Sequence, residues 1–223
     1  MSLQLISPDQ HKFDCYEAMP AGKSRGTVVV IQEIFGVNAH IRAVCDQYAA
    51  AGYRALAPAL FDRIRPGIEL GYGPEHRDEA MSLAFKQLTL EQALMDIQTA
   101  VKYAGEKTGT AIVGYCFGGL LAWLSACELE QVAAVSSYYG GGIGRFKEKR
   151  PRCPVQLHFG RQDTVIPLAD VEALQALHPA VEIFLYDAGH GFNCDQRPSY
   201  DAPSAELALA RTLALLEKHL AGN

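Results

Sequence analysis

The stretch Ala111-Ile112-Val113-Gly114-Tyr115-Cys116-Phe117-Gly118-Gly119 decides how the rest of the chain is interpreted. Its apolar, partly β-branched beginning predicts a buried strand over residues 111–114, and the apolar residues after it predict a helix over 118–129. A Gly-x-Cys-x-Gly turn between a strand and a helix is typical of a nucleophile held on a strained turn at positive φ. The alternative is a glycine-rich turn that carries a buried, inert cysteine.

The same alternation of strand and helix recurs on both sides of this stretch. Further strands are predicted at 27–32, 53–57, 131–138, 154–159 and 181–186, and further helices at 41–52, 90–101, 167–177 and 202–220. Strands that are apolar on both faces and separated by helices predict an α/β fold, with a mostly parallel central sheet and helices on both faces. The chain shows no repeat and no linker, so we expect one domain over residues 1–223.

Two segments do not follow this alternation. Residues 8–20 are expected to add an antiparallel hairpin at the edge of the sheet. Residues 62–85 contain several Gly and Pro residues among charges and have weak periodicity. We expect the second segment to be an insertion or lid over the carboxyl edge of the sheet, where open α/β folds place their sites.

The composition is that of an ordinary globular protein, with 49% hydrophobic and 20% charged residues. The 20 Lys and Arg residues against 25 Asp and Glu residues give a formal net charge of -5, so neither nucleic acid nor an anionic membrane is expected as a partner. The N-terminus lacks the basic and apolar regions of a secretory signal, which favours a cytoplasmic location. The six cysteines form no Cys-x-x-Cys pair and are expected to be free thiols.

A cysteine nucleophile needs a base, and the base needs an acid that orients it. Asp163 follows the predicted strand 154–159, and His190 follows the predicted strand 181–186. The chain order nucleophile, acid, histidine is the order of α/β-hydrolases. Taken singly, Asp163 could cap the next helix and His190 could be an exposed loop residue. His158 lies inside an apolar strand and is interpreted as a core residue.

The sequence lacks the signals of the common cofactor sites. The glycine-rich turn around Cys116 contains neither the Gly-Lys-[Ser/Thr] of a phosphate loop nor the Gly-x-Gly-x-x-Gly of a dinucleotide site. His190 and Cys194 form a His-x-x-x-Cys pair, but two ligands without a further clustered pair make a weak metal site. We therefore expect no metal and no other cofactor.

Three motifs together resemble the dienelactone hydrolase family. They are Gln32-Glu33-Ile34-Phe35-Gly36-Val37-Asn38, the cysteine turn quoted above, and Ala188-Gly189-His190-Gly191-Phe192. The resemblance covers nearly the whole chain and implies an α/β-hydrolase that acts on lactones and related esters through a Cys-His-Asp triad. It implies that Cys116 is the nucleophile, that His190 is the general base and acid, and that Asp163 orients His190.

The resemblance also implies roles for the first of these motifs. Glu33 would lie beside the nucleophile and help to control its protonation, and the backbone amides of Ile34 and Phe117 would form the oxyanion hole. The alternative for Glu33 is a buried structural carboxylate that is satisfied by hydrogen bonds.

The chain departs from the family pattern at positions that concern the substrate. Arg77 matches one arginine that binds a substrate carboxylate in the best-known members, but Met81 stands where those members have a tyrosine. Cys194 replaces the second expected arginine, and Arg197, three residues later, is a candidate substitute. Arg77 and Arg197 could equally be ordinary surface cations. Activity on dienelactone itself therefore does not follow from the resemblance.

A cysteine nucleophile limits the range of substrates that we expect. A thiolate leaves a tetrahedral intermediate readily, so a cysteine nucleophile favours small-molecule lactones and enol esters whose leaving group is a stabilised enolate. The acyl group would pass to Cys116 as a thioester, which water activated by His190 would hydrolyse. A general carboxylesterase or thioesterase of the same fold, and a non-catalytic domain that senses thiol chemistry at Cys116, remain alternatives. The sequence leaves the oligomeric state open.

Overall fold

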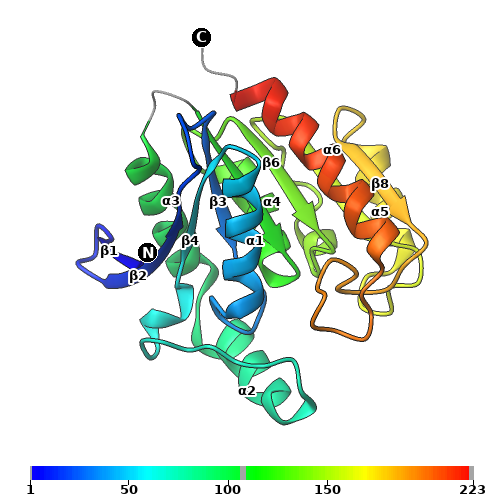
Figure 1. Cartoon of the computed structure of the whole chain (residues 1–223). Helices are drawn as coiled ribbons and strands as arrows, with labels where there is room; N and C mark the ends of the chain where they lie inside the picture. The colour runs from blue at the N-terminus through cyan, green and yellow to red at the C-terminus, as the bar shows by residue number, and fades with distance from the viewer. Residues whose placement is uncertain (1, 106–108, 221–223) are drawn as a thin grey trace.

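A single sheet of eight strands organises the computed structural model, which describes residues 2–105 and 109–220 (Figure 1). The strands are β1 Ser2–Ile6, β2 Lys12–Ala18, β3 Thr27–Ile31, β4 Arg54–Pro58, β5 Thr110–Tyr115, β6 Ala134–Tyr138, β7 Val155–Gly160 and β8 Glu182–Tyr186. Their order is β1-β2-β4-β3-β5-β6-β7-β8, antiparallel from β1 to β4 and parallel from β4 to β8. The predicted mostly parallel sheet is confirmed.

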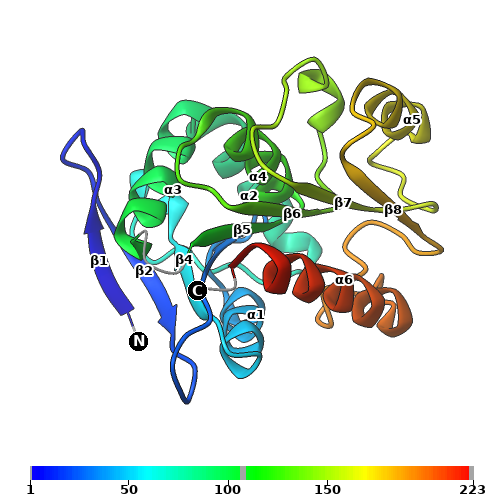
Figure 2. The same cartoon turned by 90° about the horizontal axis from the view of Figure 1, so that it is seen from above.

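Helices cover both faces of this sheet. The α-helices are α1 Ala39–Ala50, α2 Arg77–Ser82, α3 Leu90–Ala104, α4 Phe117–Glu128, α5 Leu168–Leu177 and α6 Ala202–Leu220. Figure 2 shows α1 and α6 on one face and α3, α4 and α5 on the other. The helix α4 is apolar on all sides, and its residues from Phe117 to Cys127 are buried, because it packs over the central strands β5 and β6.

Two predicted strands differ from the observed ones. The strand expected at 131–138 begins only at Ala134, because Gln131 adopts a positive φ of 63° that extended backbone does not accommodate. The strand expected to be buried over 181–186 is β8, which has only one neighbour, β7, in the sheet. Its residues are therefore mostly half-exposed, and the prediction of a buried strand was wrong there.

The antiparallel hairpin is present, but it lies nearer the N-terminus than predicted. Its strands are β1 and β2, and its turn covers residues 7–11. The hairpin was expected to begin at Pro8, which instead lies in this turn. Apolar Leu5, Phe13 and Cys15 point inward from the hairpin. This inward alternation is what attaches the antiparallel edge to the core.

The segment 62–85 lies beyond the carboxyl ends of the strands, as expected of a lid (Figure 1). It is more helical than its weak periodicity indicated, with short 3-10 turns at Leu60–Arg63 and Pro74–His76, then α2, then a π-helical turn at Leu83–Gln87. Hydrogen bonds hold it to the loop after β3; among them, Leu70 N donates to Phe35 O at 2.8 Å and Asn38 Nδ2 donates to Leu70 O at 3.0 Å. The lid is thereby anchored beside Glu33.

His158 is a core residue, as predicted. It lies in β7, where Nδ1 is 2.7 Å from the Tyr186 hydroxyl and Nε2 is 3.1 Å from Ser136 Oγ. Burial, with the nearby Arg211 cation, lowers the pKa of His158 to about 3. The ring is therefore neutral at ordinary pH and supports the sheet through hydrogen bonds.

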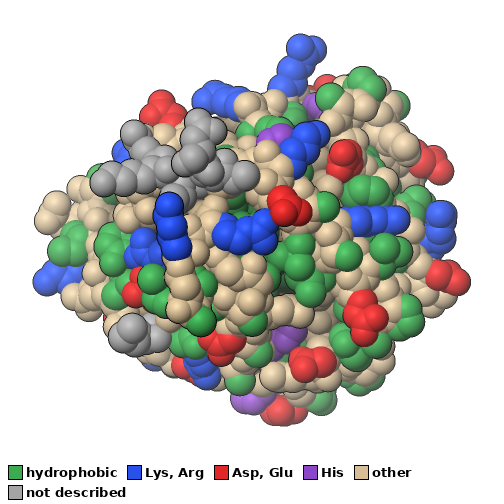
Figure 3. All heavy atoms as spheres, turned by 45° about the horizontal axis from the view of Figure 1, so that its top comes forward, with side chains coloured by type: hydrophobic (Ala, Val, Ile, Leu, Met, Phe, Trp, Pro, Cys, Tyr) green, Lys and Arg blue, Asp and Glu red, His purple; other side chains and the backbone are tan. Residues whose placement is uncertain are grey.

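The surface carries mixed charge on the face in Figure 3, where Lys and Arg side chains alternate with Asp and Glu side chains. All six cysteines are unpaired, as predicted. Within residues 2–105 and 109–220, none of the helices combines the length and the apolar character that crossing a bilayer requires.

Candidate active site

Cys116 occupies the tight turn between β5 and α4. Its φ of 54° and ψ of -112° give the positive φ that the Gly-x-Cys-x-Gly motif predicts. A Cβ atom at Gly114 would overlap the carbonyl oxygen of Gly118, and a Cβ atom at Gly118 would overlap the carbonyl oxygen of Ile31. Both glycines are therefore required if the turn is to pack against the end of β3. The Cys116 side chain stays partly exposed at the carboxyl edge of the sheet.

Three predicted side chains form a continuous hydrogen-bonded line. His190 Nε2 is 3.2 Å from Cys116 Sγ, and His190 Nδ1 is 2.8 Å from Asp163 Oδ2. The residues come from the turns after β5, β8 and β7, which are far apart in sequence. The imidazole is therefore held between a sulfur and a carboxylate in the geometry that base-assisted nucleophilic chemistry requires.

The Asp163 carboxylate is fixed by its own loop. Its Oδ1 atom accepts from the backbone amides of Val165 at 2.7 Å and Ile166 at 3.2 Å, and its side chain is fully buried. It does not cap the following helix, because α5 begins at Leu168 after Pro167. Asp187, which is closer to His190 in sequence, is exposed and accepts from Gln162 instead.

The surroundings of His190 favour its charged form. Burial opposes the charge, but the hydrogen bonds to Asp163 and to Cys116 prevail and raise the pKa of His190 to about 10. Near neutral pH the ring therefore carries a proton on Nε2 that can move toward the Cys116 side of the site. This arrangement can supply a proton to a departing oxygen and take one back from water.

Comparisons with known proteins identify the chain's family. The sequence pattern of the dienelactone hydrolase family matches residues 13–220. The chain belongs to the dienelactone hydrolase family. A carboxymethylenebutenolidase from a Pseudomonas species is 34% identical over 221 residues, covering 93% of this chain and 90% of that protein. The carboxymethylenebutenolidase of Pseudomonas putida is 31% identical over 224 residues, covering 96% of this chain and 94% of that protein.

A solved structure agrees with this assignment. A crystal structure from Klebsiella pneumoniae matches with a TM-score of 0.85 and 29% identity, covering 98% of each chain. The predicted family and the predicted α/β-hydrolase fold are thus confirmed, and this dienelactone hydrolase family member is a hydrolase.

Glu33 is buried just beyond β3 and is paired on both carboxylate oxygens. The Tyr72 hydroxyl donates to Oε2 at 2.6 Å, and Arg197 Nη1 lies 3.4 Å from Oε1. Burial opposes the charge of Arg197, but Glu33 and then Cys116 raise the pKa of Arg197, so it remains a cation. Glu33 is therefore held by one residue of the lid and by one residue of the loop after β8.

The two backbone amides predicted to form an oxyanion hole lie on adjoining segments. Phe117 is the first residue of α4, so its amide is one of the N–H groups that an α-helix leaves free at its start. Ile34 follows Glu33 in the loop after β3. The close packing of Gly118 against Ile31 brings these segments together beside Cys116.

The two predicted substrate arginines differ in position. Arg197 reaches the site through Glu33, and Gly191, with φ of +80° and no Cβ, leaves room for its guanidinium. Arg77 is exposed at the first position of α2, outside this group of contacting side chains. Cys194, which stands at the position of the second expected arginine, is fully buried.

Other residues of the site were missed by sequence reasoning. Tyr72 contacts Glu33, Tyr139 packs edge-on against His190 with ring centroids 5.2 Å apart, and Phe85 packs against Phe117 at 5.4 Å. The signal for Tyr72 was its position as a lone aromatic between Gly71 and Gly73 in a polar stretch. Phe85 and Met81 remain about half exposed and present apolar surface on the lid.

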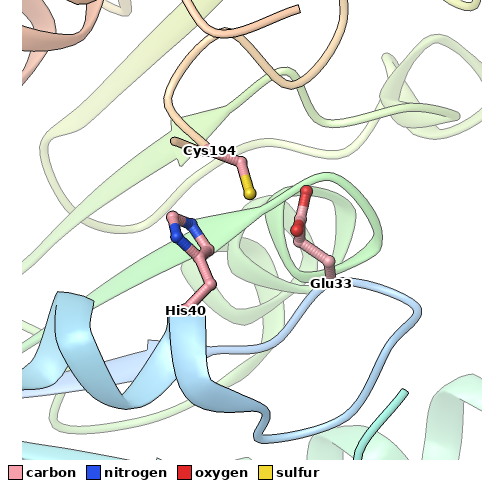
Figure 4. A group of neighbouring side chains, drawn as sticks. All are labelled: Glu33, His40 and Cys194. Atoms are coloured by element: carbon pink, nitrogen blue, oxygen red, sulfur yellow. The ribbon is translucent and has the colours of Figure 1, made fainter. Parts of the chain in front are cut away.

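His190 and Cys194, whose spacing gave only a weak metal signal, have different neighbours in the structure. The structure places Cys194 with Glu33 and His40, which come from the loop after β3 and from the start of α1 (Figure 4). His190 is instead occupied by Cys116 and Asp163.

Proposed function

We propose that the protein hydrolyses lactones and activated esters through a thioester on Cys116, with His190 as base and acid and Asp163 as the group that orients it. The hydrogen-bonded line from Cys116 Sγ through His190 to Asp163 is the observation that carries this proposal. The relatives named carboxymethylenebutenolidase support the substrate class. The reaction needs no cofactor.

The steps follow from the positions of these groups. The Cys116 sulfur attacks the carbonyl carbon, and the amides of Ile34 and Phe117 stabilise the resulting oxyanion. When the intermediate collapses, the C–O bond breaks and the leaving enolate takes the proton from His190 Nε2. Neutral His190 then takes a proton from water, whose oxygen attacks the thioester and releases Cys116.

We further propose that Arg197 attracts a carboxylate on the substrate, and that Arg77 assists from the lid. Arg197 is partly exposed, is charged, and interacts electrostatically with Glu33 and Cys116. A planar guanidinium suits two-point recognition of a carboxylate. Arg77 is free of the contacts that hold Arg197 and would act only from the exposed start of α2.

A substrate panel tests the proposed function. We expect kcat/KM for enol lactones and aryl esters to exceed that for simple alkyl esters by about 100-fold, because the sulfur is expelled in preference to a poor alkoxide. Intact-mass measurement during turnover should detect an acyl group on Cys116. Equal rates on alkyl esters would favour a general carboxylesterase, and no turnover on any ester would favour the thiol-sensing alternative.

The Glu33→Gln variant tests whether Glu33 influences the nucleophile. Removing the buried negative charge takes away the counter-charge of Arg197, a cation that interacts electrostatically with Cys116, and this favours the thiolate. We expect faster alkylation of Cys116 near neutral pH together with turnover slowed by about tenfold or more, since any proton-accepting help is lost as well. Rates of alkylation and turnover across pH decide this. Wild-type values for both would make Glu33 a purely structural carboxylate.

A further inference from the structure

A second group of reactive side chains lies behind Glu33. Glu33, His40 and Cys194 each offer one ligand atom, and these atoms all lie within 4.8 Å of one another. Their exposed fractions are 0%, 4% and 0%. Figure 4 shows the three side chains converging from the loop after β3, from the start of α1 and from the loop that contains Cys194. The tertiary fold thus concentrates a carboxylate, an imidazole and a thiol in one buried place.

The two ring nitrogens of His40 have different surroundings, and these leave one of them available to bind a cation. Its Nδ1 atom lies 3.3 Å from the carboxylate oxygen Oδ1 of Asp195. Its Nε2 atom is buried and has no hydrogen-bond partner within the part of the chain that the structure describes. A histidine that donates one ring N–H to a carboxylate, and so keeps the lone pair of the other nitrogen free, is the usual arrangement at a protein metal site. Without such a ligand, a buried ring nitrogen that has no hydrogen-bond partner lowers the stability of the fold.

The geometry points to a binding site for a thiophilic divalent cation of the Zn²⁺ class, formed by Glu33, His40 and Cys194. Oxygen, nitrogen and sulfur from one carboxylate, one imidazole and one thiolate are donors that Zn²⁺ accepts, with water completing four ligands. Binding replaces the S–H bond of Cys194 by a metal–sulfur bond and releases the proton to solvent. Ligand atoms around tetrahedral Zn²⁺ lie roughly 3.5 Å apart, so the side chains must close by about 1 Å on the ion.

The cation would compete with contacts that the structure shows. Arg197 Nη1 lies 3.4 Å from Glu33 Oε1, and the Tyr72 hydroxyl donates a hydrogen bond to Glu33 Oε2. A bound cation would take over the role of Arg197 as the counter-charge of Glu33. Occupancy of this cluster should therefore slow hydrolysis while leaving the Cys116 sulfur itself unmodified.

Cadmium alone is the probe, and it is added to the Cys116→Ala protein so that the thiol of Cys116 cannot bind it. We expect one equivalent of Cd²⁺ to produce cadmium–thiolate absorbance in the ultraviolet. The band should vanish when Cys194→Ala is added to the Cys116→Ala protein, and it should persist when Cys153→Ala is added instead, because Cys153 is a partly buried thiol outside the cluster. This readout does not depend on hydrolysis, so it can fail or succeed separately from the proposed function.

Two milder variants make the test independent of damage to the core. Asp195→Asn changes an exposed side chain, and we expect it to weaken Cd²⁺ binding by about tenfold because it removes the carboxylate behind His40. Arg197→Gln should tighten binding, since it removes the competing cation. Absence of the band, or a band that survives Cys194→Ala, would overturn the proposal, as would Cd²⁺ affinity that neither Asp195→Asn nor Arg197→Gln changes.

Discussion

Replacing Cys116 by alanine should lower kcat/KM by about 10⁴-fold or more while leaving the protein folded. The thioester of the proposed reaction forms and breaks at the Cys116 sulfur. The Cys116 side chain, in contrast, contributes little to the stability of the fold. Its side chain is partly exposed, it donates no cap to α4, and its described hydrogen bond is the one to His190. Alanine and cysteine bear the positive φ at a similar cost. Ester hydrolysis and a thermal melt, measured together, check both parts.

Cys153→Ala is the matched control, because Cys153 is also a partly buried free thiol but lies away from the site. It should keep wild-type turnover. Cys116→Ser should also be a poor enzyme, since a hydroxyl ionises far less readily than a thiol. Turnover of Cys116→Ala within tenfold of wild type would remove Cys116 from the proposed mechanism.

Asp163→Asn should reduce the rate by about 10³-fold to 10⁴-fold with little change in substrate affinity. Asparagine can keep accepting from Val165 and Ile166 through Oδ1, so the loop should hold its shape. What disappears is the negative charge 2.8 Å from His190 Nδ1. The imidazolium is then stabilised less, and the ring loses the partner that fixes its tautomer.

The same variant predicts the direction of a titration. The hydrogen bond that Asp163 accepts from His190 is the first of the contributions that raise the pKa of His190 to about 10, so weakening it should lower that pKa. His190 should therefore lose its proton at lower pH in Asp163→Asn, which an NMR titration of the imidazole can follow. Asp187→Asn is the control, because Asp187 is exposed and pairs with Gln162. A normal rate for Asp163→Asn and a slow one for Asp187→Asn would transfer the role of the acid to Asp187.

The sequence by itself determined the central architecture and the nearness of three candidate residues. Buried strands that alternate with helices have one favourable arrangement, a mostly parallel sheet covered on both faces. The carboxyl ends of such strands meet at one edge, so residues directly after β5, β7 and β8 had to lie near each other. Gly114 and Gly118 fixed the turn at Cys116 because no larger residue fits there. Family membership was also readable in these short motifs.

Only the tertiary structure decided what surrounds those residues. The lid carries Tyr72 to Glu33 along a backbone of short turns, whose packing leaves no regular apolar period in the sequence. Cys194 stands where the family pattern has an arginine, yet it turns inward to Glu33 and His40, while Arg197 reaches Glu33 from three residues further on. Such contacts depend on the paths of loops that are far apart in sequence. Local spacing constrains the ends of strands, but it does not constrain the direction of a side chain in a loop.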